Sequence, residues 1–152
     1  FGGRFGWDVE FINESLRATF DKVAIDRSRI ALAGFSDGAS YSLSLGLANG
    51  DLFNRVIAYS PGFIIETPLR GAPSFFVSHG TNDTILSVDE TRDVILPRLR
   101  ALHRQVRYRE FEGTHQVPSE ISTEALNWLK FGWECEERRM SDVAARTSYS
   151  CP

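Results

Sequence analysis

The chain has 152 residues, a length that predicts a single domain. Hydrophobic residues make up 42% and charged residues 24%, which is typical of folded globular proteins and excludes disordered, collagen-like and coiled-coil compositions. The formal net charge of −3 provides no basic field for nucleic acid or an anionic membrane. The longest apolar run, residues 30–35, is far shorter than the roughly 20 residues that span a bilayer.

Both ends of the chain are informative. The first residue is Phe1 rather than Met, and no basic-plus-apolar signal segment opens the sequence, so we expect a processed product or a piece of a longer, cytoplasmic protein. Two cysteines, Cys135 and Cys151, are too few for a disulfide scaffold, and the sequence leaves their pairing open. Residues 134–152 lack any period, which predicts a mobile tail after a domain of residues 1–133.

The first half of the chain begins with an expected helix and strand. Apolar residues at three- and four-residue spacing predict an amphipathic helix over residues 8–23, with Asp8 as its N-cap. A polar connector at residues 25–28 follows. Residues 29–34 are short, apolar and bounded by glycine, which predicts a strand buried on both faces.

The remaining segments continue to alternate between helix and strand. A second helix is predicted over residues 37–49, with Asn49 and Gly50 as its stop. A third is predicted over 89–103, despite Pro97, and a last one over 119–131. Three further strands are predicted at residues 55–59, 74–78 and 105–111, the last an edge strand because polar and apolar residues alternate in it. The order predicts an α/β fold with about four parallel strands and crossover helices.

The turn between the first strand and the second helix carries a motif. Residues 34–38 (GFSDG) fit G-x-S-x-G, and the surrounding strand–turn–helix is the context that a nucleophile elbow requires. Flanking glycines allow strand and helix to approach closely. Ser36 would then project above the carboxyl end of the sheet, where the Asp37 N–H can stabilise an oxyanion. The alternative is an ordinary glycine-rich connection.

A nucleophilic serine needs a base and an orienting acid. His115 lies in a loop after the last strand, and Asp83 lies in a loop after the third. Because Ser36, Asp83 and His115 each follow a different parallel strand, all three are expected at the carboxyl edge of the sheet. Their order along the chain is the one found in α/β-hydrolases.

Other candidates have simpler interpretations. His103 lies in an arginine-rich helical segment and is expected at the surface. His79 ends a strand and is expected to be structural. Asp37 adjoins the serine and would point away from it. Asp89 is interpreted as a helix N-cap, and Glu112 as the end of an edge strand.

Four segments together are more specific than any motif alone. They are residues 25–30 leading into 34–38, residues 59–62, residues 79–83 (HGTND) and residues 113–118 (GTHQVP). In this order they resemble the carboxyl-terminal part of an α/β-hydrolase of the phospholipase/carboxylesterase group, which includes acyl-protein thioesterases, with polyhydroxybutyrate-depolymerase-like esterases as relatives. The resemblance implies that Ser36 is the nucleophile, Asp83 the acid, His115 the base and His79 a supporting residue. Thr114 and the pair Leu86-Ser87 depart from the usual pattern in ways that affect pocket shape.

The resemblance implies a serine hydrolase that cleaves small carboxylic esters or thioesters through an acyl-enzyme. It implies neither a cofactor nor a metal, and no nucleic-acid partner. Apolar side chains near the three loops are candidates for an acyl pocket, although they could equally cap the core. These candidates are Phe63, Ile64, Ile65, Ile85, Leu86 and Val117.

One part of such a site is not recognised in the sequence. A second oxyanion N–H comes from a loop after an earlier strand, and the resemblance implies that this strand precedes residue 1. The strand at residues 30–33 would then be an exposed apolar edge, open to self-association. The alternatives are therefore a catalytically incomplete fragment or a binding module. A domain that grips phosphate at the turn of residues 34–38 is disfavoured, because no Lys follows Gly38.

Overall fold

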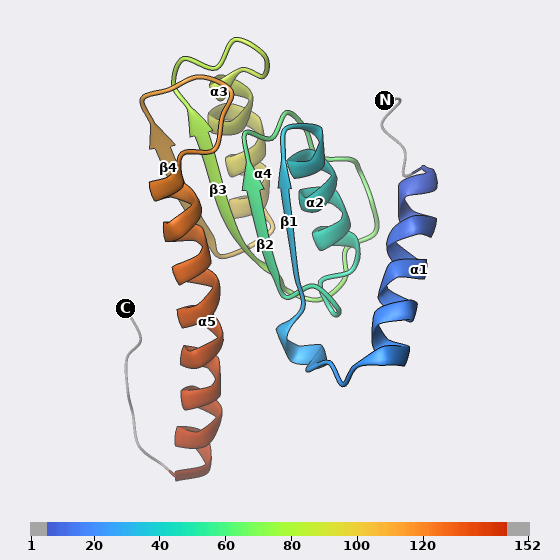
Figure 1. Ribbon diagram of the computed structural model, residues 1–152. Helices are drawn as coiled ribbons and strands as arrows, with labels where there is room; N and C mark the ends of the chain where they lie inside the picture. Colours follow the sequence, from blue (N-terminus) through green and yellow to red (C-terminus); the bar gives the residue numbers. More distant parts are fainter. Residues whose placement is uncertain (1–5, 146–152) are drawn as a thin grey trace.

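The computed structural model describes the backbone of residues 6–145 and the side chains of residues 6–132. Its centre is a parallel sheet with the strand order β1-β2-β3-β4 (Figure 1). Each crossover leads to the neighbouring strand, so all four carboxyl ends meet at one edge of the sheet. The strands are β1 (Ala31–Phe35), β2 (Arg55–Tyr59), β3 (Ser74–Gly80) and β4 (Val106–Phe111). The predicted α/β class and the four predicted strands are confirmed.

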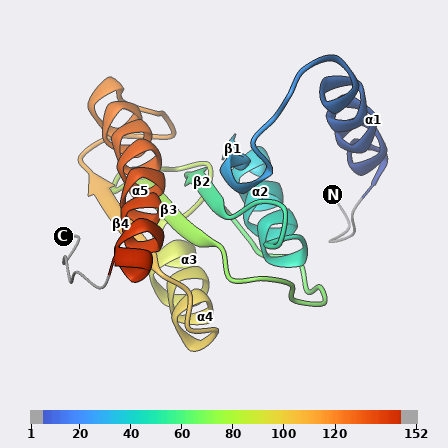
Figure 2. The same cartoon turned by 90° about the horizontal axis from the view of Figure 1, so that it is seen from below.

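Helices cover both faces of this sheet. One face carries α2 together with the helical segment α3–α4, the other face carries α5, and α1 lies beyond β1 beside α2 (Figures 1 and 2). The helical elements are α1 (Trp7–Lys22), η1 (Arg27–Arg29), α2 (Asp37–Ala48), α3 (Val88–Glu90), the π-turn η2 (Thr91–Ile95), α4 (Leu96–Ala101) and α5 (Ser119–Ala145). Within residues 6–145, none of them is both long and apolar enough to cross a membrane.

Two apolar clusters hold the layers together. The larger lies between the sheet and the helices α2 and α4, and the smaller joins the opposite face to α5. Alternate residues of β2 and β3 enter the two clusters, which explains why these strands are continuously apolar in sequence. The larger cluster contains Leu43, Val56, Phe75, Val77 and Leu99, and the smaller contains Ile57, Phe76, Ile121 and Ala125.

The first strand is less buried than the apolar pattern of residues 29–34 led us to expect. It begins at Ala31, and only Leu32 packs against the larger cluster. Ala33 and Phe35 point to the other face and are exposed, Phe35 by 40%, because the buried residues of α5 pack against β2 and β3 instead. The prediction of a strand buried on both faces is therefore wrong, since β1 occupies an edge of the sheet.

The opposite edge strand agrees with its sequence pattern. Along β4, exposed and half-buried residues alternate. Its exposed Arg107 and Arg109 both form ion pairs with Glu124 of α5, at 2.7 and 2.8 Å. The predicted edge position of this strand is confirmed.

The helix expected over residues 89–103 is instead a composite. Ser87 rather than Asp89 caps it, because the Ser87 side chain accepts the Asp89 N–H at 3.2 Å, while Asp89 pairs with Arg92. The π-helical segment η2 ends at Ile95. Pro97 follows two residues later, in the first turn of α4. Proline lacks the N–H that a regular helix would use there, and the wider turn accommodates it.

The outer helices differ from prediction at their ends. Gly6 rather than Asp8 occupies the N-cap of α1, and Asp8 lies in the first turn. The predicted apolar residues within α1 are half-buried, whereas Val23, which follows the end of the helix, is 52% exposed and Trp7, on another side, is 87% exposed. The predicted end of the last helix at residue 131 is also wrong, because α5 continues to Ala145.

The chain's expected tail is only partly covered by the structure. Residues 134–145 have helical backbone, while residues 146–152, with Cys151, lie outside the described residues, as does the side chain of Cys135. The division of the chain after residue 133 stays a prediction.

Candidate active site

The turn between β1 and α2 has a strained backbone at its serine. Ser36 takes φ 59° and ψ −127°, a conformation that non-glycine residues rarely adopt, and it occupies the N-cap of α2. A Cβ at Gly34 would lie 2.1 Å from the carbonyl oxygen of Gly38, so only glycine fits there. A Cβ at Gly38 would meet nothing within 4 Å, so the predicted steric need for the second glycine is wrong.

Two loops after β3 and β4 lie directly against each other. A Cβ at Gly80 would come within 2.5 Å of the carbonyl oxygens of Gly113 and Thr114, so glycine permits this approach. Two backbone hydrogen bonds join the loops, from the Thr81 N–H to the Phe111 carbonyl and from the Asn82 N–H to the Gly113 carbonyl, each 2.9 Å long. The loop that carries Asp83 is thereby fixed beside the loop that carries His115.

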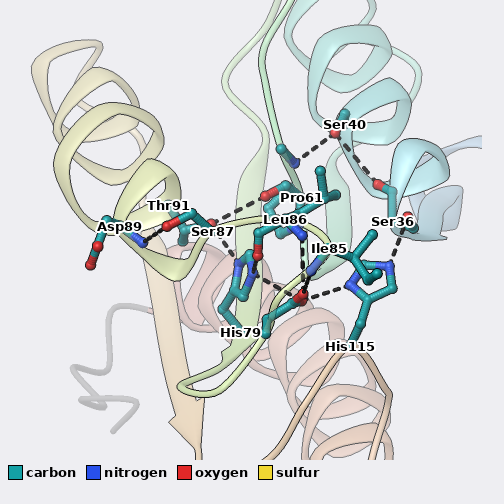
Figure 3. A network of polar contacts seen from close by, with 12 residues as sticks. Ser36, Ser40, Pro61, His79, Ile85, Leu86, Ser87, Asp89, Thr91 and His115 are labelled. Carbon is teal, nitrogen blue, oxygen red and sulfur yellow. Dashed lines mark hydrogen bonds and ion pairs between the residues drawn. The ribbon is translucent and has the colours of Figure 1, made fainter.

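The three residues predicted to act together lie in one hydrogen-bonded row (Figure 3). The hydroxyl oxygen of Ser36 lies 2.9 Å from His115 Nε2. On the other side of the ring, His115 Nδ1 lies 2.6 Å from Asp83 Oδ2. The row brings together the ends of β1, β3 and β4, which the parallel sheet places at one edge.

Asp83 is held as a carboxylate. Its Oδ1 accepts the backbone N–H groups of Ile85 and Leu86, at 2.9 and 3.0 Å, and its side chain is inaccessible to solvent. Burial by itself raises the pKa of Asp83, but the hydrogen bond from His115 and those from Leu86 and Ile85 outweigh it, so the pKa falls below its ordinary value. Asp83 therefore accepts the Nδ1–H of His115, which leaves Nε2 free to accept the Ser36 proton.

The His115 ring has an aromatic neighbour that sequence reasoning missed. The Phe35 ring centroid lies 4.6 Å from that of His115, at an interplanar angle of 35°. Phe35 occupies the variable position before the serine in G-x-S-x-G, so an aromatic residue at that position was the available signal. The imidazole thus has an aromatic contact in addition to the hydrogen-bond partners of its two nitrogens.

Two buried serines of α2, also missed, hold the segment that follows β2. Ser40 Oγ accepts the N–H of Gly62 at 2.9 Å, and more weakly that of Phe63 at 3.3 Å. One turn along, Ser44 Oγ accepts the N–H of Ile65 at 2.9 Å. Serines on the apolar side of a predicted helix were the signal, because a buried hydroxyl needs a partner.

The candidate acyl-pocket residues are dispersed between core and surface. Ile65 is buried and Ile64 packs against the larger apolar cluster, so both contribute to the core. Ile85 is 67% exposed beside the hydrogen-bonded row. The other three candidates, Phe63, Leu86 and Val117, are half-buried, and Leu86 lies over Gly62. Their assignment to a pocket stays a prediction.

The remaining candidates take different places. His79 is fully buried, with Nδ1 2.8 Å from the Thr91 hydroxyl. His103, as expected, is exposed, and so are Asp37 and Glu112. Among residues with described side chains, no group of three or more His, Cys, Asp or Glu could hold a metal ion.

Comparison with known sequences connects this geometry to a family. The family described as Phospholipase/Carboxylesterase matches residues 7–131. A curated relative is acyl-protein thioesterase 1 of Yarrowia lipolytica, 28% identical over 129 residues, which cover 77% of this chain and 56% of the relative. The chain thus spans little more than half the length of that relative.

Solved structures share the fold. A carboxylesterase of Bacillus cereus has a TM-score of 0.63 at 23% identity, over 80% of this chain and 56% of its own. SOBER1 of Arabidopsis thaliana has a TM-score of 0.69 at 15% identity, over 80% and 61%. The esterase PE8 has a TM-score of 0.69 at 22% identity, over 78% and 57%. At these identities the similarity concerns the fold alone.

Proposed function

The chain belongs to the phospholipase/carboxylesterase family, and from this we propose that it is a serine hydrolase of small carboxylic esters or thioesters. The observation that carries the proposal is the hydrogen-bonded row from Ser36 through His115 to Asp83. A row of this kind supplies a nucleophile, a general base and an orienting acid. The name of the Yarrowia lipolytica relative adds thioesters to the candidate substrates.

In the proposed acylation, His115 Nε2 takes the hydroxyl proton of Ser36 while Oγ forms a bond to the substrate's carbonyl carbon. Asp83 keeps the Nδ1–H of the ring in place and stabilises the positive charge that the ring gains. The tetrahedral intermediate then collapses, and the bond from carbon to the alcohol oxygen or thiol sulfur breaks. His115 returns its proton to this leaving group, and the acyl group remains on Ser36.

Deacylation repeats these steps with water. His115 removes a proton from water as the water oxygen attacks the acyl carbon. The bond to Ser36 Oγ breaks, the carboxylic acid leaves, and Ser36 regains its proton from His115. No cofactor takes part in this proposed cycle.

The proposed oxyanion donor is the backbone N–H of Asp37. It is the first residue of α2, where N–H groups have no partner within the helix and the helix dipole favours negative charge. We propose that Ile85 and Leu86, which lie beside the row in Figure 3, and Phe63, in the segment after β2, contact the acyl or alcohol part of the substrate. Their apolar character suits a substrate without charge near the scissile bond.

A fluorophosphonate probe tests the proposal. We expect it to label the chain at Ser36, and we expect the Ser36→Ala variant to lose the label and at least about a thousandfold of nitrophenyl acetate hydrolysis. Ser42→Ala, on the buried side of the same helix, is the matched control and should keep both. Equal labelling of wild type and Ser36→Ala would contradict the assignment of the nucleophile.

A second candidate is a binding module, or a catalytically incomplete unit. Two observations favour it: the chain spans 56% of its thioesterase relative, and within the described residues only the Asp37 N–H is assigned to the oxyanion. Loss of one such donor reduces turnover by roughly 10²–10³. Absence of labelling in a chain that circular dichroism shows to be folded would support this candidate.

A further inference from the structure

His79 is a buried titratable group that the proposed reaction does not use. It lies near the end of β3, and its side chain is inaccessible to solvent. Its Nδ1 lies 2.8 Å from the Thr91 hydroxyl, and its Nε2 lies 2.9 Å from the carbonyl oxygen of Leu86 (Figure 3). A buried imidazole with a partner on each nitrogen has a defined orientation and tautomer.

These partners decide which nitrogen of His79 carries the proton. The carbonyl of Leu86 can only accept, so the Nε2 that faces it must be the donor. The hydroxyl of Thr91 has one proton, which it can donate to Nδ1 at 2.8 Å or to the carbonyl of Pro61 at 3.3 Å. In the second case the Thr91 oxygen accepts a proton from Nδ1. His79 is therefore an Nε2–H donor, whether its ring is neutral or charged.

The same Nε2 also reaches the carboxylate of Asp83. It lies 3.2 Å from Oδ2, the oxygen that accepts the Nδ1–H of His115 at 2.6 Å. His79 Nε2 is thus hydrogen-bonded to the Leu86 carbonyl oxygen and lies 3.2 Å from Oδ2 as well. Leu86 also contacts Asp83 directly, since its own N–H donates to Asp83 Oδ1. One buried carboxylate oxygen thus lies between two imidazoles.

We propose that His79 is a positioning residue that shares its Nε2–H with Asp83 Oδ2 and thereby sets how strongly Asp83 holds the protonated ring of His115. This inference rests on the proposed role of His115 as the base. Each donor to a carboxylate oxygen withdraws charge from it and makes it a weaker acceptor for its other partner. His79 therefore weakens the hold of Asp83 on the imidazolium that His115 becomes when it accepts a proton.

Other charged groups near His79 are already paired. Glu110 of β4 lies opposite His79 in the strand register, and its carboxylate binds Arg92 at 2.5 Å. The hydrogen bond from Arg92 is the main reason why the pKa of Glu110 is low, and His79 contributes least among the groups that affect it. Asp37, the acidic neighbour of Ser36, is exposed. These groups stay unchanged in the variants below.

The titration of His115, followed by NMR of its ring protons, tests the proposal without a substrate. His79→Leu removes the donor, so the pH at which His115 is half protonated should rise by about 0.3–1 pH unit. His79→Gln places an amide N–H near the position of Nε2, and its midpoint should stay within about 0.2 pH unit of wild type. Val77→Ala, which opens a cavity in the same strand, is the control and should not shift it.

The wild-type protein provides a second readout in case His79→Leu does not fold. Ring ¹⁵N shifts should identify His79 with a proton on Nε2, and a ring with its only proton on Nδ1 would overturn the proposal. An unchanged or lowered His115 midpoint in a folded His79→Leu variant would also overturn it, because a purely structural histidine predicts that result. Failure of the fluorophosphonate experiment would instead reject the hydrolase function and leave these titrations measurable.

Discussion

At the scale of single residues, two glycines of the same motif have different physical roles. Gly34 faces the backbone of α2, and a Cβ there would overlap the carbonyl of Gly38. Gly38 itself has open space around its Cα and lies in the first turn of the helix. Gly34 is thus required by the close approach of strand and helix, whereas Gly38 is not required by the described structure.

This difference predicts opposite effects of the same substitution. Gly34→Ala should destabilise the protein by more than about 3 kcal/mol, because backbone atoms at 2.1–2.7 Å cannot be displaced cheaply. Gly38→Ala should be neutral or stabilising by up to about 1 kcal/mol, since alanine favours helix more than glycine does. Urea unfolding followed by circular dichroism measures both. Similar losses in the two variants would contradict the interpretation.

At the scale of elements, α2 organises the site from two sides. Its N-terminus presents Ser36, and its buried serines bind the N–H groups of the segment after β2. This segment leaves the sheet without regular secondary structure between β2 and β3, so its N–H groups need partners from elsewhere. The two hydroxyls of Ser40 and Ser44 accept three of these N–H groups.

Removal of one hydroxyl tests this role. Ser44→Ala leaves the buried N–H of Ile65 without its acceptor, which should reduce the free energy of unfolding by about 1–3 kcal/mol. Ser42→Ala removes a hydroxyl of the same helix that accepts none of the described N–H groups of this segment, so it should cost less, about 0.5 kcal/mol or below. Amide hydrogen exchange at Ile65 should become faster in Ser44→Ala alone. Equal stability of the two variants would contradict this role of Ser44.

At the scale of the whole molecule, the two edges of the sheet differ. The β4 edge carries alternating arginines that pair with α5. The β1 edge has no strand partner within residues 6–145, and it exposes Ala33 and Phe35. An apolar edge with unpaired backbone groups is a surface on which another chain can add a strand. The self-association expected from the sequence stays a prediction, and substitutions on this edge can test it.

A charge placed on this edge should oppose such pairing. We expect wild type to associate as its concentration rises, and we expect Ala33→Lys to remain monomeric over the same range, because an edge lysine hinders strand addition. Leu126→Lys adds the same charge at an exposed position of α5 and should associate like wild type. Sedimentation velocity measures all three. Association of Ala33→Lys equal to that of wild type would exclude the β1 edge as the interface.

The sequence by itself determined the alternation of helix and strand, the parallel sheet and the residues brought to its carboxyl edge. These features follow from local periodicity and from glycine-bounded turns, which neighbouring residues encode. Only the tertiary structure decided that Phe35 lies against His115 and that His79 reaches the carboxylate of Asp83. The Ser87 cap of α3 is a local contact that the sequence around it could have indicated. The contacts of Phe35 and His79 are different, because they form only when the sheet and its loops bring these side chains together.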